Sequence, residues 1–348
     1  MHSGRAEPVK PYPLRQKAMP QTKIKIKRTL KGSRNMSRKV TIIGAGSVGS
    51  TITYTMTVSG LASELVLIDI NKEKALGEAM DIQQGTPFCA PIKIYAGDYK
   101  DAEGSDIVVI TSGMPRKANQ TRIDLAQNNV NVIKEIAGEI TKYAPNALYI
   151  IVSNPVDVLT YVFCKISGIP EHRVIGSGTI LDTARLRARL AEDIGISQKN
   201  IHAYVLGEHG DSSFVPWSIA QVGCIKLQDC NRCIISKHPG ELNYEEIEQY
   251  MRTSGSQIIG RKGATFYAIA ISVCHIVQTL FGSANSTMTV SSMMHGEYGI
   301  EDVCLSIPFI VGPGGIAGHV LPALTEEEVA KLQHSADVLK NVIKQVKF

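Results

Sequence analysis

The feature that most constrains the fold is an apolar, β-branched stretch that runs straight into a glycine pattern, in the segment "KVTIIGAGSVGS". Residues 40–43 predict a strand, and a helix is expected to begin near Val48. The GxGxxG pattern between them consists of Gly44, Gly46 and Gly49. In this setting the first glycine makes a tight turn, the second lets a pyrophosphate approach the backbone, and the third lets helix and strand pack closely. The segment predicts the start of a dinucleotide-binding fold.

A second apolar run, "ELVLIDI", carries an acid next to its last residue. Asp69 follows the last glycine by 20 residues. At that position a carboxylate can accept a hydrogen bond from a ribose 2′-hydroxyl and repel a 2′-phosphate. An acid that merely caps the next helix would not explain the coincidence with the glycines. The two motifs together predict NAD rather than NADP.

Further apolar runs, "DIVVIT" and "ALYIIVSNP", alternate with helical patterns such as "DLAQNNVNVIKEIAGEI". Alternation of this kind predicts an α/β fold with a doubly wound (Rossmann) parallel sheet. Ligands of such sheets bind beyond the carboxyl ends of the strands, so Gly113 and Asn154 are expected in the crevice. A chain of 348 residues exceeds the size of a single core. We therefore expect a NAD-binding domain at 38–180 and an α+β substrate-binding domain at 181–348.

The basic character of the chain belongs to its first residues. Residues 1–39 contain 12 of the 37 Lys and Arg residues and one acid, Glu7, which leaves 25 basic and 31 acidic residues, or −6, in the remainder. Residues 1–37 lack the apolar periodicity needed for a buried face that would offset the entropic cost of ordering the chain. A disordered extension is therefore expected. Organelle targeting and nucleic-acid attachment are possible roles for such a segment. We favour a non-functional extension upstream of a natural start at Met36.

The cysteine pattern and the apolar runs bear on the compartment. The seven cysteines are odd in number and scattered, which suits a reducing cytoplasm better than a disulfide framework. The cluster "CIKLQDCNRC" lacks the fourth ligand that zinc normally requires, so no metal site is expected. No apolar run reaches the roughly 18 to 20 residues of a membrane helix, and no secretory h-region is present. We expect a cytoplasmic protein without membrane or nucleic-acid partners.

The segment "YVLGEHGDSSFVPW" places His209 between two glycines and beside the acids Glu208 and Asp211. On its own this segment is as consistent with a polar turn as with a catalytic site. The helix predicted in "GTILDTARLRARLAEDIG" supplies candidate partners, because Asp182 and Arg185 lie about 60° apart on one face at roughly 100° per residue. Arg187 points about 200° away from Arg185 and cannot serve the same small site.

A polar loop, "MPRKANQTRIDL", follows Gly113 at the position of an active-site lid. It contains Arg116, Lys117 and Arg122. A charge run of this kind is usually a solvated surface, but arginines over a nucleotide crevice can also hold an anion and polarise a carbonyl.

From Arg38 to Phe348 the chain resembles the lactate and malate dehydrogenase family, and within it the bacterial L-lactate dehydrogenases. The motifs that carry the resemblance are "GAGSVG", "LIDI", "TRIDL", "SNPVDVLTY", "GSGTILDTAR", "GEHGDSSFVPWS", "RKGATFYAIA" and "GEYGIEDVCLSIP". The resemblance implies NAD-dependent hydride transfer between a 2-hydroxy acid and a 2-keto acid. A non-catalytic NAD-binding or RNA-associated protein would require a missing catalytic residue, and none is missing.

The resemblance also implies residue roles. His209 is the proton donor and acceptor, Asp182 orients it, Arg122 polarises the substrate carbonyl and Arg185 clamps the substrate carboxylate. The remaining implied substrate contacts are Arg116, Asn154 and Thr265. The implied cofactor-binding residues are Gly44, Gly46, Val48, Gly49, Asp69, Lys74, Tyr99, Gly113 and Asn154.

The sequence is compatible with two branches of the family, the lactate and the malate dehydrogenases. Arg116 stands where lactate enzymes mostly have glutamine and malate enzymes have arginine, and Ala118 and Asn119 replace a frequent Pro-Gly. Glu208 and Thr265 resemble the lactate branch. Arg187 and His202 also do, and they match positions that bind fructose 1,6-bisphosphate in bacterial enzymes. We expect a bisphosphate-regulated L-lactate dehydrogenase that forms a homotetramer, with a malate or broad 2-keto acid dehydrogenase as the alternative.

Overall fold

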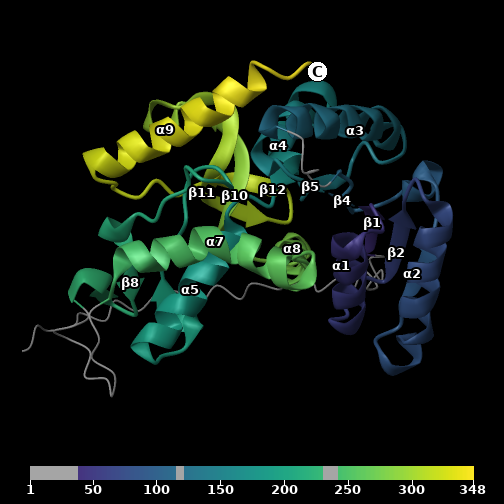
Figure 1. The fold of residues 1–348 in the computed structure, drawn as a ribbon. Helices are drawn as coiled ribbons and strands as arrows, with labels where there is room; N and C mark the ends of the chain where they lie inside the picture. The colour runs from purple at the N-terminus through teal and green to yellow at the C-terminus, as the bar shows by residue number, and fades with distance from the viewer. Residues whose placement is uncertain (1–37, 115–120, 230–241) are drawn as a thin grey trace, which may run out of the picture. The chain divides into compact units, whose positions relative to one another are not determined.

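A computed structural model describes residues 38–114, 121–229 and 242–348 (Figure 1). Several of the sequence predictions fall outside these ranges. They concern the extension 1–37, the lid residues Arg116, Lys117, Ala118 and Asn119, and two cysteines of the predicted non-metal cluster, Cys230 and Cys233.

The described chain is organised around a nine-stranded sheet with the order β12-β11-β10-β6-β5-β4-β1-β2-β3. The strands β1 to β6 are parallel to one another, and β10 to β12 are antiparallel. The strands are β1 (Lys39–Ile43), β2 (Glu64–Ile68), β3 (Lys93–Ala96), β4 (Ile107–Ile110), β5 (Leu148–Ile151), β6 (Val174–Gly176), β10 (Ser286–His295), β11 (Glu301–Gly312) and β12 (Gly315–His319). A small antiparallel sheet contains β7 (Ile201–His202), β8 (Gln221–Val222) and β9 (Ile225–Lys226).

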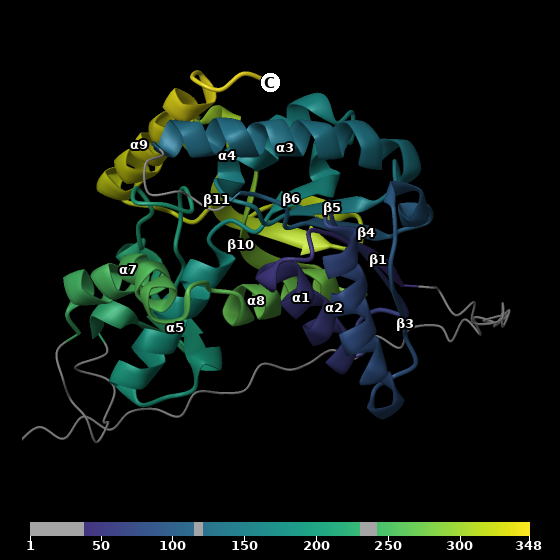
Figure 2. The ribbon, with the colours of Figure 1, turned by 45° about the vertical axis from the view of Figure 1, so that its right-hand side comes forward.

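Helices cover both faces of the large sheet. They are α1 (Ser47–Val58), α2 (Lys72–Gln84), α3 (Arg122–Tyr143), α4 (Val156–Ile166), α5 (Ile180–Ile194), α7 (Tyr244–Lys262), α8 (Tyr267–Leu280) and α9 (Glu326–Ile343). Figure 2 shows α3, α4 and α9 on one face of the sheet and α1, α2 and α8 on the other. Because both faces are covered, the central strands are continuously apolar, and every residue of β4 and β5 is buried.

The predicted α/β fold with its doubly wound parallel sheet is confirmed. The sequence did not predict that β10, β11 and β12 extend the same sheet, with Ser291 of β10 paired antiparallel to Gly176 of β6. This pairing covers the backbone edge that β6 would otherwise expose. The second half of the chain therefore completes the sheet of the first half.

The glycine turn has the packing that the sequence predicts. A Cβ atom at Gly49 would lie 1.8 Å from the carbonyl oxygen of Gly44, so the start of α1 could not approach β1 with any larger residue there. The turn is thereby held directly above the carboxyl end of β1. No helix in the described part of the chain is both long and apolar enough to cross a membrane.

Candidate active site

A cavity of about 330 Å³ lies where the beginning of α1, the end of β5, the beginning of α5 and the loop 207–213 meet. Its walls also include residues of α7 and α8. It brings together predicted residues from five separate segments of the sequence. The predicted site residues that line it are Val48, Asn154, Asp182, Arg185, His209 and Thr265.

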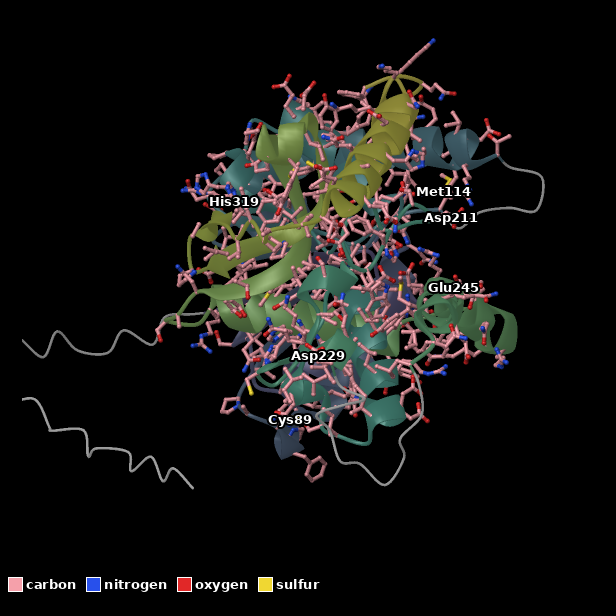
Figure 3. The ribbon with its side chains drawn as sticks, turned by 90° about the vertical axis from the view of Figure 1, so that its left-hand side faces the viewer. Cys89, Met114, Asp211, Asp229, Glu245 and His319 are labelled. Atoms are coloured by element: carbon pink, nitrogen blue, oxygen red, sulfur yellow. The ribbon has the colours of Figure 1, made fainter. Side chains whose placement is uncertain are left out.

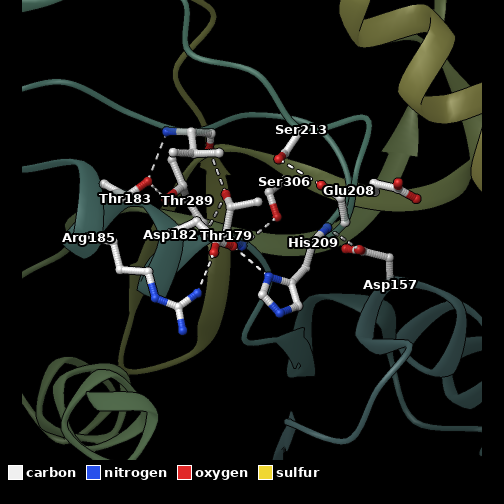
Figure 4. A network of polar contacts seen from close by, with 12 residues as sticks. Asp157, Thr179, Asp182, Thr183, Arg185, Glu208, His209, Ser213, Thr289 and Ser306 are labelled. Atoms are coloured by element: carbon white, nitrogen blue, oxygen red, sulfur yellow. Dashed lines mark hydrogen bonds and ion pairs between the residues drawn. The ribbon is translucent and has the colours of Figure 1, made fainter. Parts of the chain in front are cut away.

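Asp182 stands between His209 and Arg185 (Figure 4). One carboxylate oxygen lies 2.5 Å from Nδ1 of His209, and the other accepts a hydrogen bond of 3.0 Å from the guanidinium of Arg185. As the helical spacing predicts, Arg185 and Asp182 share one face of α5. The contact on Nδ1 leaves Nε2 as the ring nitrogen that can exchange a proton with a substrate in the cavity.

The buried carboxylate changes the acid strength of the histidine. The charge of Asp182 raises the pKa of His209 to about 9, against a smaller opposing effect of burial. Burial by itself would raise the pKa of Asp182, but His209 and Arg185 outweigh it and the pKa is lowered. The pair is therefore an imidazolium beside a carboxylate at neutral pH, which is a form that can deliver a proton.

A second carboxylate, which the sequence analysis missed, holds the backbone of the same histidine. Asp157 in the first turn of α4 is 3% exposed and accepts a 2.7 Å hydrogen bond from the His209 amide. Burial raises the pKa of Asp157 to about 6. Its other oxygen and the nearby hydroxyl of Ser291 are buried, and neither makes a hydrogen bond of good geometry within the described residues. The one available signal was an acid at the start of the apolar run "VDVLTYVF".

Arg122, the first residue of α3, is placed at the rim of the site rather than in it. Its guanidinium forms a 2.5 Å ion pair with Asp211, and the two side chains are 71% and 77% exposed. Figure 3 labels Asp211 at the edge of the molecule. Asp211 is itself a lining residue of the cavity, so Arg122 is one residue removed from the substrate space.

The cofactor end of the crevice is built mainly from backbone. Asp69 accepts hydrogen bonds from the amides of Ala45, at 2.6 Å, and Asn71, at 2.8 Å. It lines a groove of about 320 Å³ together with Lys72 and Gly97. The N-terminus of α1 has no side-chain cap and no acid in its first turn, so its amides and positive dipole end suit a pyrophosphate. Among the described residues, apart from the two chain neighbours of Gly46, no atom lies within 4 Å of where its Cβ would be, which leaves space for a ligand to approach.

Besides the three glycines of the turn, three predicted cofactor residues line neither cavity. Lys74 is exposed on α2 and its amide is bonded to Asn71. Tyr99 packs against the core beside α3, and burial raises its pKa. Gly113 follows β4 and lies next to Ser153, so the ends of β4 and β5 meet as the parallel sheet requires. Their roles toward NAD stay predictions.

Arg187 is separated from the cavity, as its helical position predicts. Its Nε donates a 3.0 Å hydrogen bond to the carbonyl of Ala203, and its guanidinium stacks 4.9 Å above the ring of Tyr204. Ala203 directly follows His202, whose side chain is exposed. Among the described residues, no group of three or more His, Cys, Asp or Glu side chains could hold a metal ion.

Both parts of the chain match models of one protein family. Residues 38–176 match the model described as lactate/malate dehydrogenase, NAD binding domain, and residues 179–348 match lactate/malate dehydrogenase, alpha/beta C-terminal domain. An L-lactate dehydrogenase of Acetivibrio thermocellus is 47% identical over 311 residues, which are 88% of this chain and 96% of that protein. An L-lactate dehydrogenase of Thermoanaerobacter pseudethanolicus is 46% identical over 309 residues, with 88% and 99% covered.

Solved structures of lactate dehydrogenases are also similar to this chain. A lactate dehydrogenase from a Medee basin deep-sea metagenome library superposes with a TM-score of 0.84 at 40% identity, covering 89% of this chain and 98% of the other. The minor L-lactate dehydrogenase of Enterococcus mundtii gives a TM-score of 0.85 at 36% identity, with 90% and 99% covered. The cavity, its charged triad and these similarities lead to one conclusion: the chain belongs to the lactate/malate dehydrogenase family and is an NAD-dependent 2-hydroxy acid dehydrogenase.

Proposed function

We propose that the enzyme catalyses the reversible reduction of pyruvate to L-lactate by NADH. The observation that carries the proposal is the convergence of His209, Asp182 and Arg185 on one cavity at the end of the dinucleotide crevice. The named relatives are L-lactate dehydrogenases, which favours this substrate pair. Such an enzyme would reoxidise the NADH formed in glycolysis during fermentation.

Each residue of the triad has a distinct role in this proposal. When bound, NADH supplies the hydride that reduces the keto carbon. His209 gives a proton from Nε2 to the carbonyl oxygen, and Asp182 keeps the ring in the required orientation. The planar guanidinium of Arg185 offers a carboxylate two parallel hydrogen bonds, which lysine could not.

Arg122 would polarise the substrate carbonyl after leaving Asp211. An ion pair as exposed as this one is worth about 0 to 1 kcal/mol, so its loss on substrate binding costs little. Thr265 and Asn154, which line the same cavity, would contact the remaining substrate surface.

Initial rates with NADH and pyruvate or oxaloacetate, measured side by side, test the proposal. We expect pyruvate to give the higher kcat/KM and the product to be the L enantiomer. A preference for oxaloacetate of more than about tenfold would instead establish the malate or broad 2-keto acid alternative.

The sequence position that decides between these substrates is Arg116. An arginine enclosed with the methyl group of pyruvate would be an unpaired buried charge, whereas oxaloacetate offers a second carboxylate. We therefore expect side activity on oxaloacetate, and Arg116→Gln should lower that activity by about tenfold or more. An equal loss of activity on pyruvate and on oxaloacetate would show that Arg116 does not determine the choice between them.

We also propose fructose 1,6-bisphosphate as an effector that binds Arg187 and His202. The bond of Arg187 to the carbonyl of Ala203, the residue after His202, supports one cationic site, and two copies across a subunit interface would match the two phosphates. Activity and oligomer mass should respond to the bisphosphate between about pH 5.5 and 7.5. Arg187→Gln should abolish the response. Arg189→Gln on the same helix is the matched control, because Arg189 pairs with Asp193 and Glu246 instead.

A homo-oligomer, in our proposal a cytoplasmic homotetramer, is supported by exposed apolar side chains on three helices. Figure 2 shows these helices, α1, α2 and α8, on one face of the sheet. The helix α1 packs against both α2 and α8. The large apolar side chains exposed on them are Tyr54, Val58, Leu76, Met80, Tyr267 and Ile271. A second copy of the chain would bury this surface. A monomeric mass in light scattering would contradict the oligomer.

A further inference from the structure

We propose that Ser335, in the middle of α9, is a positioning residue for His209: its hydroxyl holds the catalytic loop 207–212 in place. The inference rests on the proposed function, in which His209 transfers the proton. Ser335 is separated from the loop by more than 120 residues and does not line the cavity in the described chain. It would act through the backbone of the loop.

Three successive amides of the loop are each bonded to a different element. Gly207 donates to the Ser306 carbonyl of β11 at 3.0 Å, Glu208 donates to the Ser335 hydroxyl at 2.7 Å, and His209 donates to Asp157 of α4 at 2.7 Å. The Ser335 oxygen also lies 2.9 Å from the hydroxyl of Ser212, on the far side of the turn. The backbone on both sides of His209 is thus fixed by groups distant in sequence.

The hydroxyl of Ser335 is used differently from those of two other buried helical serines, Ser254 and Ser272. Ser254 and Ser272 donate to the carbonyls of Tyr250 and Ala268, four residues earlier in their own helices. This back-bonding is the ordinary way in which a helical serine satisfies itself. The bonds of Ser335 to Glu208 and Ser212 instead join α9 to the loop.

The helix that carries Ser335 is itself firmly anchored. On the same face, seven residues earlier, Glu328 is 7% exposed and accepts hydrogen bonds from the amide and hydroxyl of Ser218. Leu332 and Ala336 on that face are buried in the core. Ser335 is fully buried, and a Cβ at Gly207 would lie 2.7 Å from its oxygen, so the loop backbone approaches the helix closely.

Removal of the hydroxyl should therefore displace the proton donor without touching either ligand. The Glu208 amide would lose its partner, and a buried unsatisfied amide favours a backbone shift that restores a hydrogen bond. A displacement of about 1 Å at a reacting group can lower a rate by about 100-fold. Arg185 lies on α5 and the cofactor groove lies at β2, so binding of the substrate carboxylate and of NADH should be retained.

The test compares Ser335→Ala with Ser272→Ala in the full chain, using whichever 2-keto acid the wild-type enzyme reduces fastest. With Ser335→Ala, kcat should fall about tenfold or more, while KM and the Kd for NADH stay within about twofold of wild type. The pH at which kcat/KM declines should also move down, since a ring displaced from Asp182 loses the charge that raises its pKa. Ser272→Ala, which also removes a buried serine hydroxyl, should keep the wild-type kcat and pH profile.

Several outcomes would overturn the inference: a Ser335→Ala enzyme with kcat within twofold of wild type, a lowered kcat with an unmoved pH profile, or a parallel loss of NADH binding. If Ser335→Ala does not fold, Ser335→Cys carries the test, because a thiol is a weak acceptor and should shift kcat and the pH profile in the same direction. Absence of pyruvate activity in the wild type would refute the proposed substrate and leave this comparison intact, because it is made with the substrate that is reduced.

Discussion

The two ends of the crevice are built in different ways. The nucleotide end is contiguous in sequence: the strand β1, the glycine turn, α1 and Asp69 all lie within residues 39–69. Its contacts are made largely by backbone amides. The catalytic end gathers Asp157, Asp182, His209 and Ser335 from α4, α5, a loop and α9. Its contacts are made by buried side chains.

This difference has an electrostatic consequence. Amide dipoles at the nucleotide end present a fixed field that no single side chain controls. At the catalytic end, two buried carboxylates contact one histidine, and the charge of each raises its pKa. A substitution at the catalytic end should therefore alter proton transfer by His209 even where the substituted residue does not contact the substrate. A substitution at the nucleotide end should alter only the binding of the cofactor.

The largest effect should come from His209→Gln. Without a group that donates a proton, turnover of the 2-keto acid should fall at least about 100-fold, whereas the Kd for NADH in a fluorescence titration should stay near wild type. The exposed histidine of α9, His334, provides the control, and His334→Gln should be fully active. Near-normal turnover in His209→Gln would remove the histidine from the mechanism.

The next largest effect should come from Asp157→Asn, which keeps the shape of the side chain. An asparagine can still accept from the His209 amide, but it removes a negative charge that raises the pKa of the histidine. We expect kcat/KM to fall about 20-fold and its decline with pH to begin at a lower pH. The exposed acid of α2 gives the control Asp81→Asn. A pH profile identical to wild type would mean that Asp157 has only a packing role.

The same contrast explains what the sequence could predict. Strand, glycine turn, helix and Asp69 follow one another along the chain, so their periodicity and spacing predicted both the fold class and NAD. The facing of Asp182 and Arg185 also followed from helical spacing, because both lie on α5.

Contacts between distant elements could not be derived in this way. No local pattern relates Asp157 to His209, or Ser335 to Glu208, since the partners meet only when α4 and α9 pack against the sheet. The same is true of β10, which extends the parallel sheet through a pairing with β6 that no periodicity encodes. Even the pairing of His209 with Asp182 was predicted by resemblance and not by spacing.

A smaller effect, confined to binding, is expected for Asp69→Ala at the nucleotide end. The variant loses the groove carboxylate that we predict to accept a hydrogen bond from a ribose hydroxyl and to repel a 2′-phosphate. The ratio of kcat/KM for NADH to that for NADPH should fall about tenfold, with kcat at saturating NADH near wild type. An unchanged ratio would show that other residues of the groove discriminate between NADH and NADPH.

The smallest effect should be a dependence of stability on pH that originates at the catalytic end. Asp182 raises the pKa of His209 from 6.5 to about 9, so the folded protein holds a proton that the unfolded chain releases between these values. This stabilisation should be complete below pH 6.5 and disappear as the pH rises through about 9. Replacement by glutamine removes the titrating group, so the difference in unfolding free energy between wild type and His209→Gln should shrink from about pH 6 to about pH 10, by on the order of 3 kcal/mol. Urea unfolding at several pH values measures the difference, and a value constant over that range would show that folding leaves the affinity of the histidine for its proton unchanged.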